Sequence, residues 1–215
     1  MQKLLRRNGL SIAVMGLFLV TFLGGQLLTG LAAYNDDRSE HGETKIGLLE
    51  YLASAHFLEA TAENWESEFL QIFVYVYITA FLFQKGSAES NDPDKPREQH
   101  RITPDSPWPA RKGGLWLKLY SHSLSLAFAL LFFGSFWLHL CGSVRLENEE
   151  RARLGLAAIS LKEHLGGAKF WFESFQNWQS EFLAIGSMVI LSIFLREKDS
   201  PESKPVEAPH SETGG

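Results

Sequence analysis

Two parts of this chain repeat one another at a fixed offset in residue number. Asn-Trp-Glu-Ser-Glu-Phe-Leu at 64–70 returns as Asn-Trp-Gln-Ser-Glu-Phe-Leu at 177–183. The offset that carries position 64 to position 177 relates other identical pairs on both sides of this motif, among them Asn35 and Asn148, Arg38 and Arg151, Ile46 and Ile159, and Glu50 and Glu163. Such periodicity constrains the architecture, because both copies have to form the same structural unit. The sequence therefore predicts a duplicated fold, and residues related by this offset are called equivalent below.

Each copy carries two long, mostly apolar segments, which is not the scattered pattern of a soluble domain. A hydrocarbon core of about 30 Å needs roughly 20 helical residues. The shorter segment of each copy reaches this length only if its helix starts near Trp65 or Trp178, which brings Glu68 and Glu181 into the interface layer. We therefore predict an all-α polytopic membrane protein with four transmembrane helices, at about 10–34, 65–84, 122–144 and 178–196.

The remaining segments divide the chain into two repeats, a linker and a tail. Apolar residues recur at helical spacing between the two spans of each copy, which predicts amphipathic interfacial helices on the outer side. Proline and charged residues crowd the linker and the tail, which predicts disorder there. The expected boundaries are repeat 1 at 1–84 with its amphipathic helix at 46–62, the linker at 85–114, repeat 2 at 115–197 with its amphipathic helix at 159–175, and the tail at 198–215.

The basic residues predict the orientation. Thirteen Lys and Arg residues precede span one, lie between spans two and three, or follow span four, whereas seven lie in the other two connections. The positive-inside rule then places both termini in the cytoplasm and makes the two copies parallel. The alternative of a cleaved secretory signal fits the basic N-terminus. However, its apolar run is long, and the equivalent run in the second copy lies in mid-chain.

The repeated Asn-Trp motif supports two interpretations. In the structural one, Asn64 and Asn177 cap helices while Trp65 and Trp178, together with Trp171, anchor them at the membrane surface. In the functional one, the motif's two glutamates face the bundle interior, where ionisable groups usually mark ion or proton paths. The depth of these glutamates in the membrane distinguishes the two.

A second polar pair occupies equivalent places in the first and third spans. Gln26 and His139 are related by the repeat offset, and counting helical rises places them in the outer half of the bundle. A candidate intramembrane cluster therefore consists of Glu68, Glu181, Gln26 and His139. The competing interpretation is that Gln26 and His139 only join helices by hydrogen bonds.

Several function classes are disfavoured. The formal net charge of −5 leaves no basic face for nucleic acid, and the single cysteine excludes an intrachain disulfide. No hydrolase, phosphate-binding or single-helix metal motif is present, so we expect no enzyme and no cofactor.

Three segments resemble one known family: Asn-Trp-Gln-Ser-Glu-Phe-Leu at 177–183, Tyr-Ser-His-Ser-Leu-Ser-Leu at 120–126 and Gly-Ser-Ala-Glu-Ser at 86–90. The resemblance is to a family of small bacterial integral membrane proteins known only as a domain of unknown function, and it implies a bacterial inner-membrane location. It supplies no functional residues. The leading hypothesis is an oligomer in the lipid bilayer that conducts or binds a small cation or proton. The alternative is a structural or envelope-sensing interaction module without transport activity.

Overall fold

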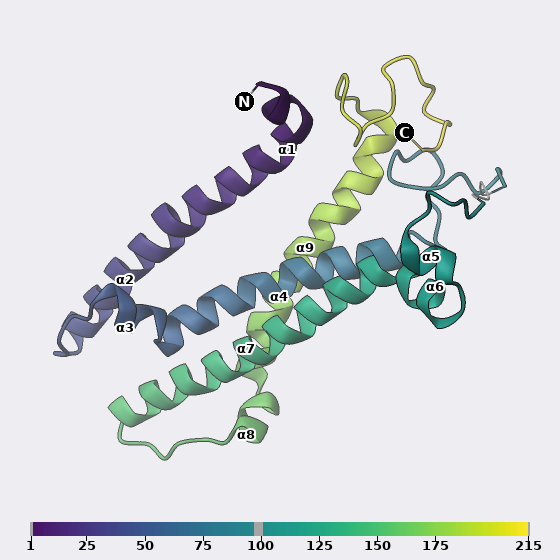
Figure 1. Cartoon of the computed structure of the whole chain (residues 1–215). Helices are drawn as coiled ribbons and strands as arrows, with labels where there is room; N and C mark the ends of the chain where they lie inside the picture. The colour runs from purple at the N-terminus through teal and green to yellow at the C-terminus, as the bar shows by residue number, and fades with distance from the viewer. Residues whose placement is uncertain (1, 97–100, 215) are drawn as a thin grey trace.

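The computed structural model describes residues 2–96 and 101–214, and within these ranges the chain is helical with no strand (Figure 1). Part of the expected linker, residues 97–100, lies outside the described residues. The helices are α1 (Gln2–Leu19), the π-helix η1 (Val20–Leu27), α2 (Leu28–Glu40), α3 (Leu48–Leu52), α4 (Ala55–Ile78), α5 (Trp108–Lys112), α6 (Gly114–Ser121), α7 (Ser123–Arg153), α8 (Leu161–Leu165) and α9 (Ala168–Phe194).

Two of the described helices are long and apolar enough to cross a membrane. One runs from Arg6 to Glu40 through α1, η1 and α2, and the other is α7, Ser123–Arg153. The apolar part of the first is not buried by the rest of the chain, and only about a fifth of the apolar part of α7 is buried. Both helices therefore present apolar side chains outward, which a lipid environment accommodates and water does not.

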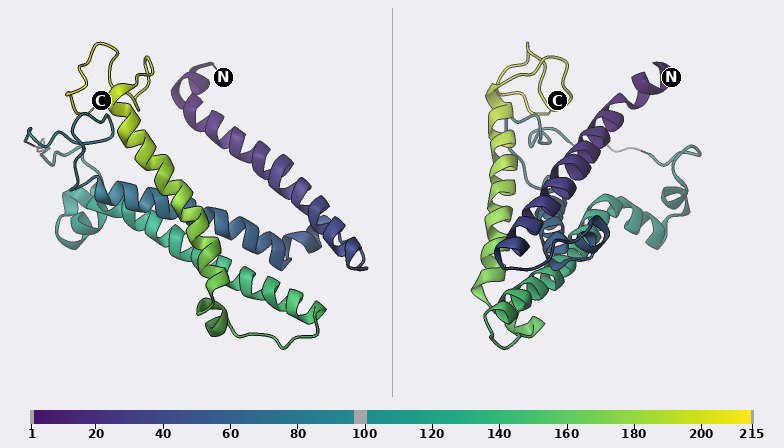
Figure 2. Two further views of the ribbon diagram at one scale, coloured as in Figure 1. Left: turned by 180° about the vertical axis from the view of Figure 1, so that it is seen from behind. Right: turned by 90° about the vertical axis from the view of Figure 1, so that its left-hand side faces the viewer.

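The long helices form an open bundle around α4. α4 packs along α7, α9 crosses α4, and the first half of α1 stands apart from the others (Figures 1 and 2). Gly142 of α7 permits the close approach, because a Cβ atom there would lie 2.7 Å from the backbone nitrogen of Glu59 on α4. Both chain ends lie toward one end of the molecule, and the α2–α3 and α7–α8 loops lie toward the other (Figure 2).

The helix starts differ from those expected. α4 begins at Ala55, where the Ser54 hydroxyl accepts a hydrogen bond from the Phe57 amide, and it continues without a break to Ile78. α9 likewise begins at Ala168, after extended Gly167. The expected amphipathic helices at 46–62 and 159–175 are thus each a five-residue helix followed by the first turns of a long one. The prediction that Asn64 and Asn177 cap helices is wrong, because both lie in helix interiors.

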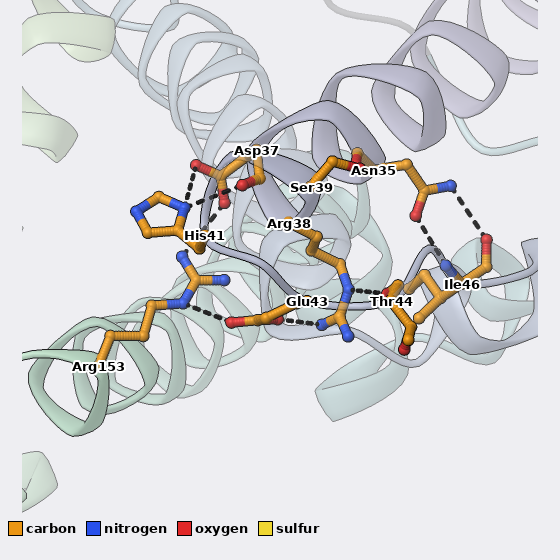
Figure 3. Close-up of polar contacts among 9 residues, drawn as sticks. All are labelled: Asn35, Asp37, Arg38, Ser39, His41, Glu43, Thr44, Ile46 and Arg153. Carbon is orange, nitrogen blue, oxygen red and sulfur yellow. Dashed lines mark hydrogen bonds and ion pairs between the residues drawn. The ribbon is translucent and has the colours of Figure 1, made fainter.

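The α2–α3 and α7–α8 loops are built from the same contacts. The Asn35 side chain bonds both the amide and the carbonyl of Ile46, and Arg38 donates to the Thr44 carbonyl (Figure 3). In the other loop Asn148 makes the same pair of bonds with Ile159, and Arg151 donates to Ala157. In these bonds, each partner in one loop is equivalent to its counterpart in the other, as a duplicated unit would produce.

One arginine connects the two loops. Arg153, at the end of α7, pairs with Glu43 at 2.9 Å and with Asp37 at 3.2 Å (Figure 3). The first loop is thereby held against the end of α7.

The expected linker and tail also make specific contacts. The linker region contains α5, and α6 follows it directly. After α9 the tail has turns but no regular helix within the described residues up to position 214. The buried ammonium of Lys204 nevertheless donates to the carbonyls of Pro209, His210 and Glu212. The Thr213 hydroxyl accepts a bond from the Gly86 amide, which joins the tail to the beginning of the linker.

Candidate functional site

A buried glutamate and a buried histidine pair where α4, α7 and α9 meet. Glu66 Oε2 lies 2.7 Å from His139 Nδ1, and both side chains have no exposed surface. The Trp178 indole N–H, from α9, donates to Glu66 Oε1 at 2.8 Å. Both carboxylate oxygens therefore have a partner, as a buried carboxylate requires.

Helical periodicity brings further carboxylates to the same face of α4. Glu59, Glu63 and Glu66 follow one another at spacings of four and three, so they lie in one row along the helix. On α7, His139 shares a buried face with Ser135 and Ser143, whose small side chains leave space for the neighbouring helix. The row of glutamates on α4 packs against this face.

The two additional glutamates come close to the histidine. One carboxylate oxygen each of Glu59 and Glu63 and one ring nitrogen of His139 all lie within 4.8 Å of one another. The Asn177 side chain, from α9, donates a hydrogen bond to Glu63 Oε1. The site thus combines three carboxylates and one imidazole, held by side chains from three helices.

Two polar atoms at this site have no hydrogen-bond partner. Among the described residues, His139 Nε2 and Ser174 Oγ are the buried side-chain polar atoms left unpaired. The equivalent residues in the first half do bond each other, because Gln26 Nε2 donates to Thr61 Oγ1 at 2.8 Å. Among the described residues, His139 Nε2 and Ser174 Oγ of the second half are therefore unpaired, whereas the equivalent Gln26 and Thr61 of the first half share a hydrogen bond.

A second polar contact lies one turn further along α7. The Ser143 hydroxyl is 2.8 Å from His164 Nε2 and 3.3 Å from Glu173 Oε2. Burial lowers the pKa of the His164 imidazole, which favours its neutral form. The residues equivalent to Ser143 and His164 are Gly30 and Tyr51, and there the Tyr51 hydroxyl occupies the space that a side chain at Gly30 would need.

The four residues of the predicted intramembrane cluster do not form one cluster. Gln26 bonds Thr61, and His139 pairs with Glu66 rather than with Glu68 or Glu181. Glu68 is exposed and, together with Gln26, lines a groove of about 730 Å³ between the first helix and α4. Within the described residues, no hydrogen bond joins the side chain of Glu68 or Glu181 to Gln26 or His139.

The three tryptophans that were predicted as interfacial anchors differ in their contacts. Trp178 directs its N–H to the buried Glu66, and Trp171 donates to the Leu165 carbonyl. Trp65 is 37% exposed and packs on Phe22. Of these three, only the Trp65 indole N–H has no hydrogen-bond partner among the described residues, and its location at the membrane surface stays a prediction.

Glu59, Glu63 and Glu66 were not among the predicted site residues. A signal was present, because three carboxylates at helical spacing on one face are unusual next to an apolar span. The span was expected to begin near Trp65, which left Glu59 in the amphipathic helix expected at 46–62 and Glu63 between that helix and the span.

Comparison with known proteins places the chain in a family. A family model described as a domain of unknown function (DUF6766) matches residues 1–215, the whole chain. The chain belongs to this family. No curated protein matches it. No solved structure matches it either. The family description gives no activity, so the function has to be inferred from the site itself.

Proposed function

We propose that this chain is a four-span integral protein of the bacterial inner membrane that binds, and as an oligomer conducts, a proton or small cation. Both termini would be cytoplasmic, and the two halves would be parallel repeats. The first and third spans correspond to the two long apolar helices. α4 and α9, with 24 and 27 residues, would supply the others, since their lengths of about 36 and 40 Å exceed the hydrocarbon core.

Three observations support this arrangement. Contacts of the same kind recur at equivalent residues of the two loops, as parallel repeats would produce. The two termini lie toward the same end of the molecule, which an even number of spans requires (Figure 2). α1 leaves its apolar side chains between Leu10 and Leu19 exposed, which suits contact with lipid or with a second copy.

The observation that carries the function is the fully buried Glu66–His139 pair. Ionisable side chains inside a membrane bundle cost several kcal/mol and typically mark substrate, ion or proton pathways. Glu59 and Glu63 lie beside this pair, so three carboxyl groups gather where α4 meets α7. Such a site attracts cations, and a histidine next to carboxylates is suited to proton exchange.

Flux through proteoliposomes tests the proposal. The wild-type chain should carry protons or a small cation above the level of empty vesicles, and Glu66→Gln should reduce that flux at least tenfold. Glu68→Gln is the matched control, because Glu68 is two residues away and exposed. Wild-type flux equal to that of empty vesicles would refute conduction. Equal flux above that level in Glu66→Gln and wild type would refute the role of the buried pair.

The alternative proposal is an interaction module in which the buried cluster only joins helices. It is favoured by the contacts that hold the beginning of the linker, where Ser87 bonds Ser192 of α9 and the Gly86 amide donates to Thr213 of the tail. A partner would then dock on this linker and tail surface. Cross-linking in native membranes, with and without residues 205–215, tests this, and identical partners in both cases would count against it.

A further inference from the structure

We propose that Glu59, Glu63 and His139 bind one divalent transition-metal ion of the Zn²⁺ or Mn²⁺ class between α4 and α7. This deepens the proposed function, on which it rests, by naming the class of cation that the site takes.

The donor atoms are close enough to share an ion. Two carboxylate oxygens and one imidazole nitrogen lie within 4.8 Å of one another. Two ligands of one tetrahedral zinc ion are about 3.4 Å apart, given metal–ligand distances of about 2.1 Å. Rotation of the two long glutamate side chains is sufficient to close that difference, while His139 stays in place.

His139 is held as metal-binding histidines usually are. Its Nδ1 is bonded to the Glu66 carboxylate at 2.7 Å, which orients the ring and leaves Nε2 for a ligand. This Nε2 is fully buried and has no hydrogen-bond partner among the described residues. An unpaired buried nitrogen is unfavourable, and coordination of an ion would remove that penalty. Asn177, which donates to Glu63, would orient a second ligand in the same way.

The local carboxylates also favour a cation. Glu59, Glu63 and Glu66 contribute three carboxylates beside a single histidine. Lys169 is the nearby lysine, but its ammonium pairs with Glu147 and Glu150 at 2.9 and 3.3 Å. Imidazole together with carboxylate is typical of Zn²⁺, Mn²⁺ and Fe²⁺ sites, whereas Ca²⁺ and Mg²⁺ sites take oxygen ligands.

The chain should hold one such site, not two. The residues equivalent to the three ligands are Phe172, Gln176 and Gln26, which offer no carboxylate or imidazole. Gln26 instead bonds Thr61 directly. A stoichiometry of one ion per chain is therefore a specific expectation.

Metal titration of the full chain tests the proposal. The purified protein in detergent is stripped with a chelator and dialysed against Zn²⁺, Mn²⁺ or Co²⁺, and the bound metal is counted by elemental analysis. We expect one ion per chain, and at least tenfold weaker binding in Glu63→Gln and in His139→Gln. Glu68→Gln, with its exposed carboxylate, should bind as wild type does. Circular dichroism checks that each variant is folded. If Glu63→Gln or His139→Gln does not fold, Glu59→Gln is tested in its place.

Absence of binding to the wild type would overturn the metal site, as would unchanged binding in the folded ligand variants. The flux experiment separates this result from the proposed function. One ion bound per chain without any flux would support the metal site and contradict conduction. Proton flux that depends on Glu66 in a chain that binds no metal would contradict the metal site and leave the proposed function standing.

Discussion

At the scale of single residues, Trp178 supplies the second hydrogen-bond partner of the buried Glu66 carboxylate. Replacing it by phenylalanine keeps the aromatic ring but leaves Glu66 Oε1 without its donor. We expect Trp178→Phe to lower the free energy of unfolding by about 1–3 kcal/mol, the cost of one unsatisfied buried polar group. Thermal unfolding in detergent measures the change.

The control for this prediction is the tryptophan at the equivalent position. Trp65→Phe removes an indole N–H that has no hydrogen-bond partner among the described residues, so its effect should stay within about 0.5 kcal/mol. Equal losses in the two variants would mean that the bond to Glu66 does not contribute to stability.

Gly142 allows α7 and α4 to approach each other. A Cβ atom there would meet the backbone of Glu59, which cannot move aside as a flexible side chain would. Gly142→Ala should therefore destabilise the protein by about 1–3 kcal/mol, the usual cost of overpacking. Gly134→Ala, in the same helix with nothing within 4 Å of the new methyl group, should be neutral or slightly stabilising. A similar melting temperature for both variants would contradict the close contact.

His164 should make stability depend on pH. Burial lowers its pKa below the ordinary value of about 6.5, so the unfolded chain binds more protons between the two values. The stability that neutral His164 contributes is complete above about pH 6.5 and is lost as the pH falls toward the folded-state pKa. Melting curves from about pH 7.5 to 5.0 should therefore shift less in His164→Gln than in wild type. If the melting temperature changes with pH by the same amount in His164→Gln and in wild type, His164 is not the source of the pH dependence.

At the scale of elements, one asparagine closes each loop. Asn148 bonds both the amide and the carbonyl of Ile159, and with a net value of about 0.5–1.5 kcal/mol for each bond, Asn148→Ala should cost about 1–3 kcal/mol. Asn64→Ala is the control, because the Asn64 side chain bonds only the Ala60 carbonyl of its own helix. Thermal unfolding compares the two, and an equal effect would show that the loops are not held by these bonds.

The elements also show how far sequence patterns predict the local structure. Apolar spacing predicted amphipathic helices at 46–62 and 159–175, where the structure has α3 and α8, each followed by the first turns of α4 or α9. The capping box of Ser160 and Glu163 marks the start of α8. The Asn-Trp motif, in contrast, predicted a helix start that the structure does not have. Asparagine caps a helix only where the residues before it are not helical. Here the residue with extended backbone before α4 is Ser54.

At the scale of the whole molecule, the tail is held by Lys204. Its ammonium is buried and donates to three carbonyls of the tail, and burial lowers its pKa. Lys204→Met removes these bonds at similar side-chain length, so cleavage within residues 205–214 by an added protease should accelerate several-fold. Lys198→Met, at an exposed position, should not change it. If the wild-type tail is cleaved as rapidly as the tail of Lys204→Met, Lys204 does not hold the tail. That result would agree with the disorder that its composition predicts.

The two halves of the molecule share a scaffold but differ in polar chemistry. Where the first half has Gln26 and Thr61, the second has His139 and Ser174, and the three carboxylates beside His139 come from the first half alone. Gln26 differs from His139 and Tyr51 from His164, so the sequence alone indicates that a site between the halves is asymmetric. The carboxylates that fill the site were not predicted, because their position depends on how α4 docks on α7.

The sequence by itself determined the all-helical class, the internal repeat with its constant offset and the two long apolar helices, because periodicity and hydropathy are properties of local sequence. Only the tertiary structure decided which glutamate is buried. Glu66 and Glu68 are two residues apart, and two residues turn a helix by about 200°, so they lie on opposite faces. The docking of α4 against α7 and α9 placed Glu66 beside His139 and Trp178 and left Glu68 exposed.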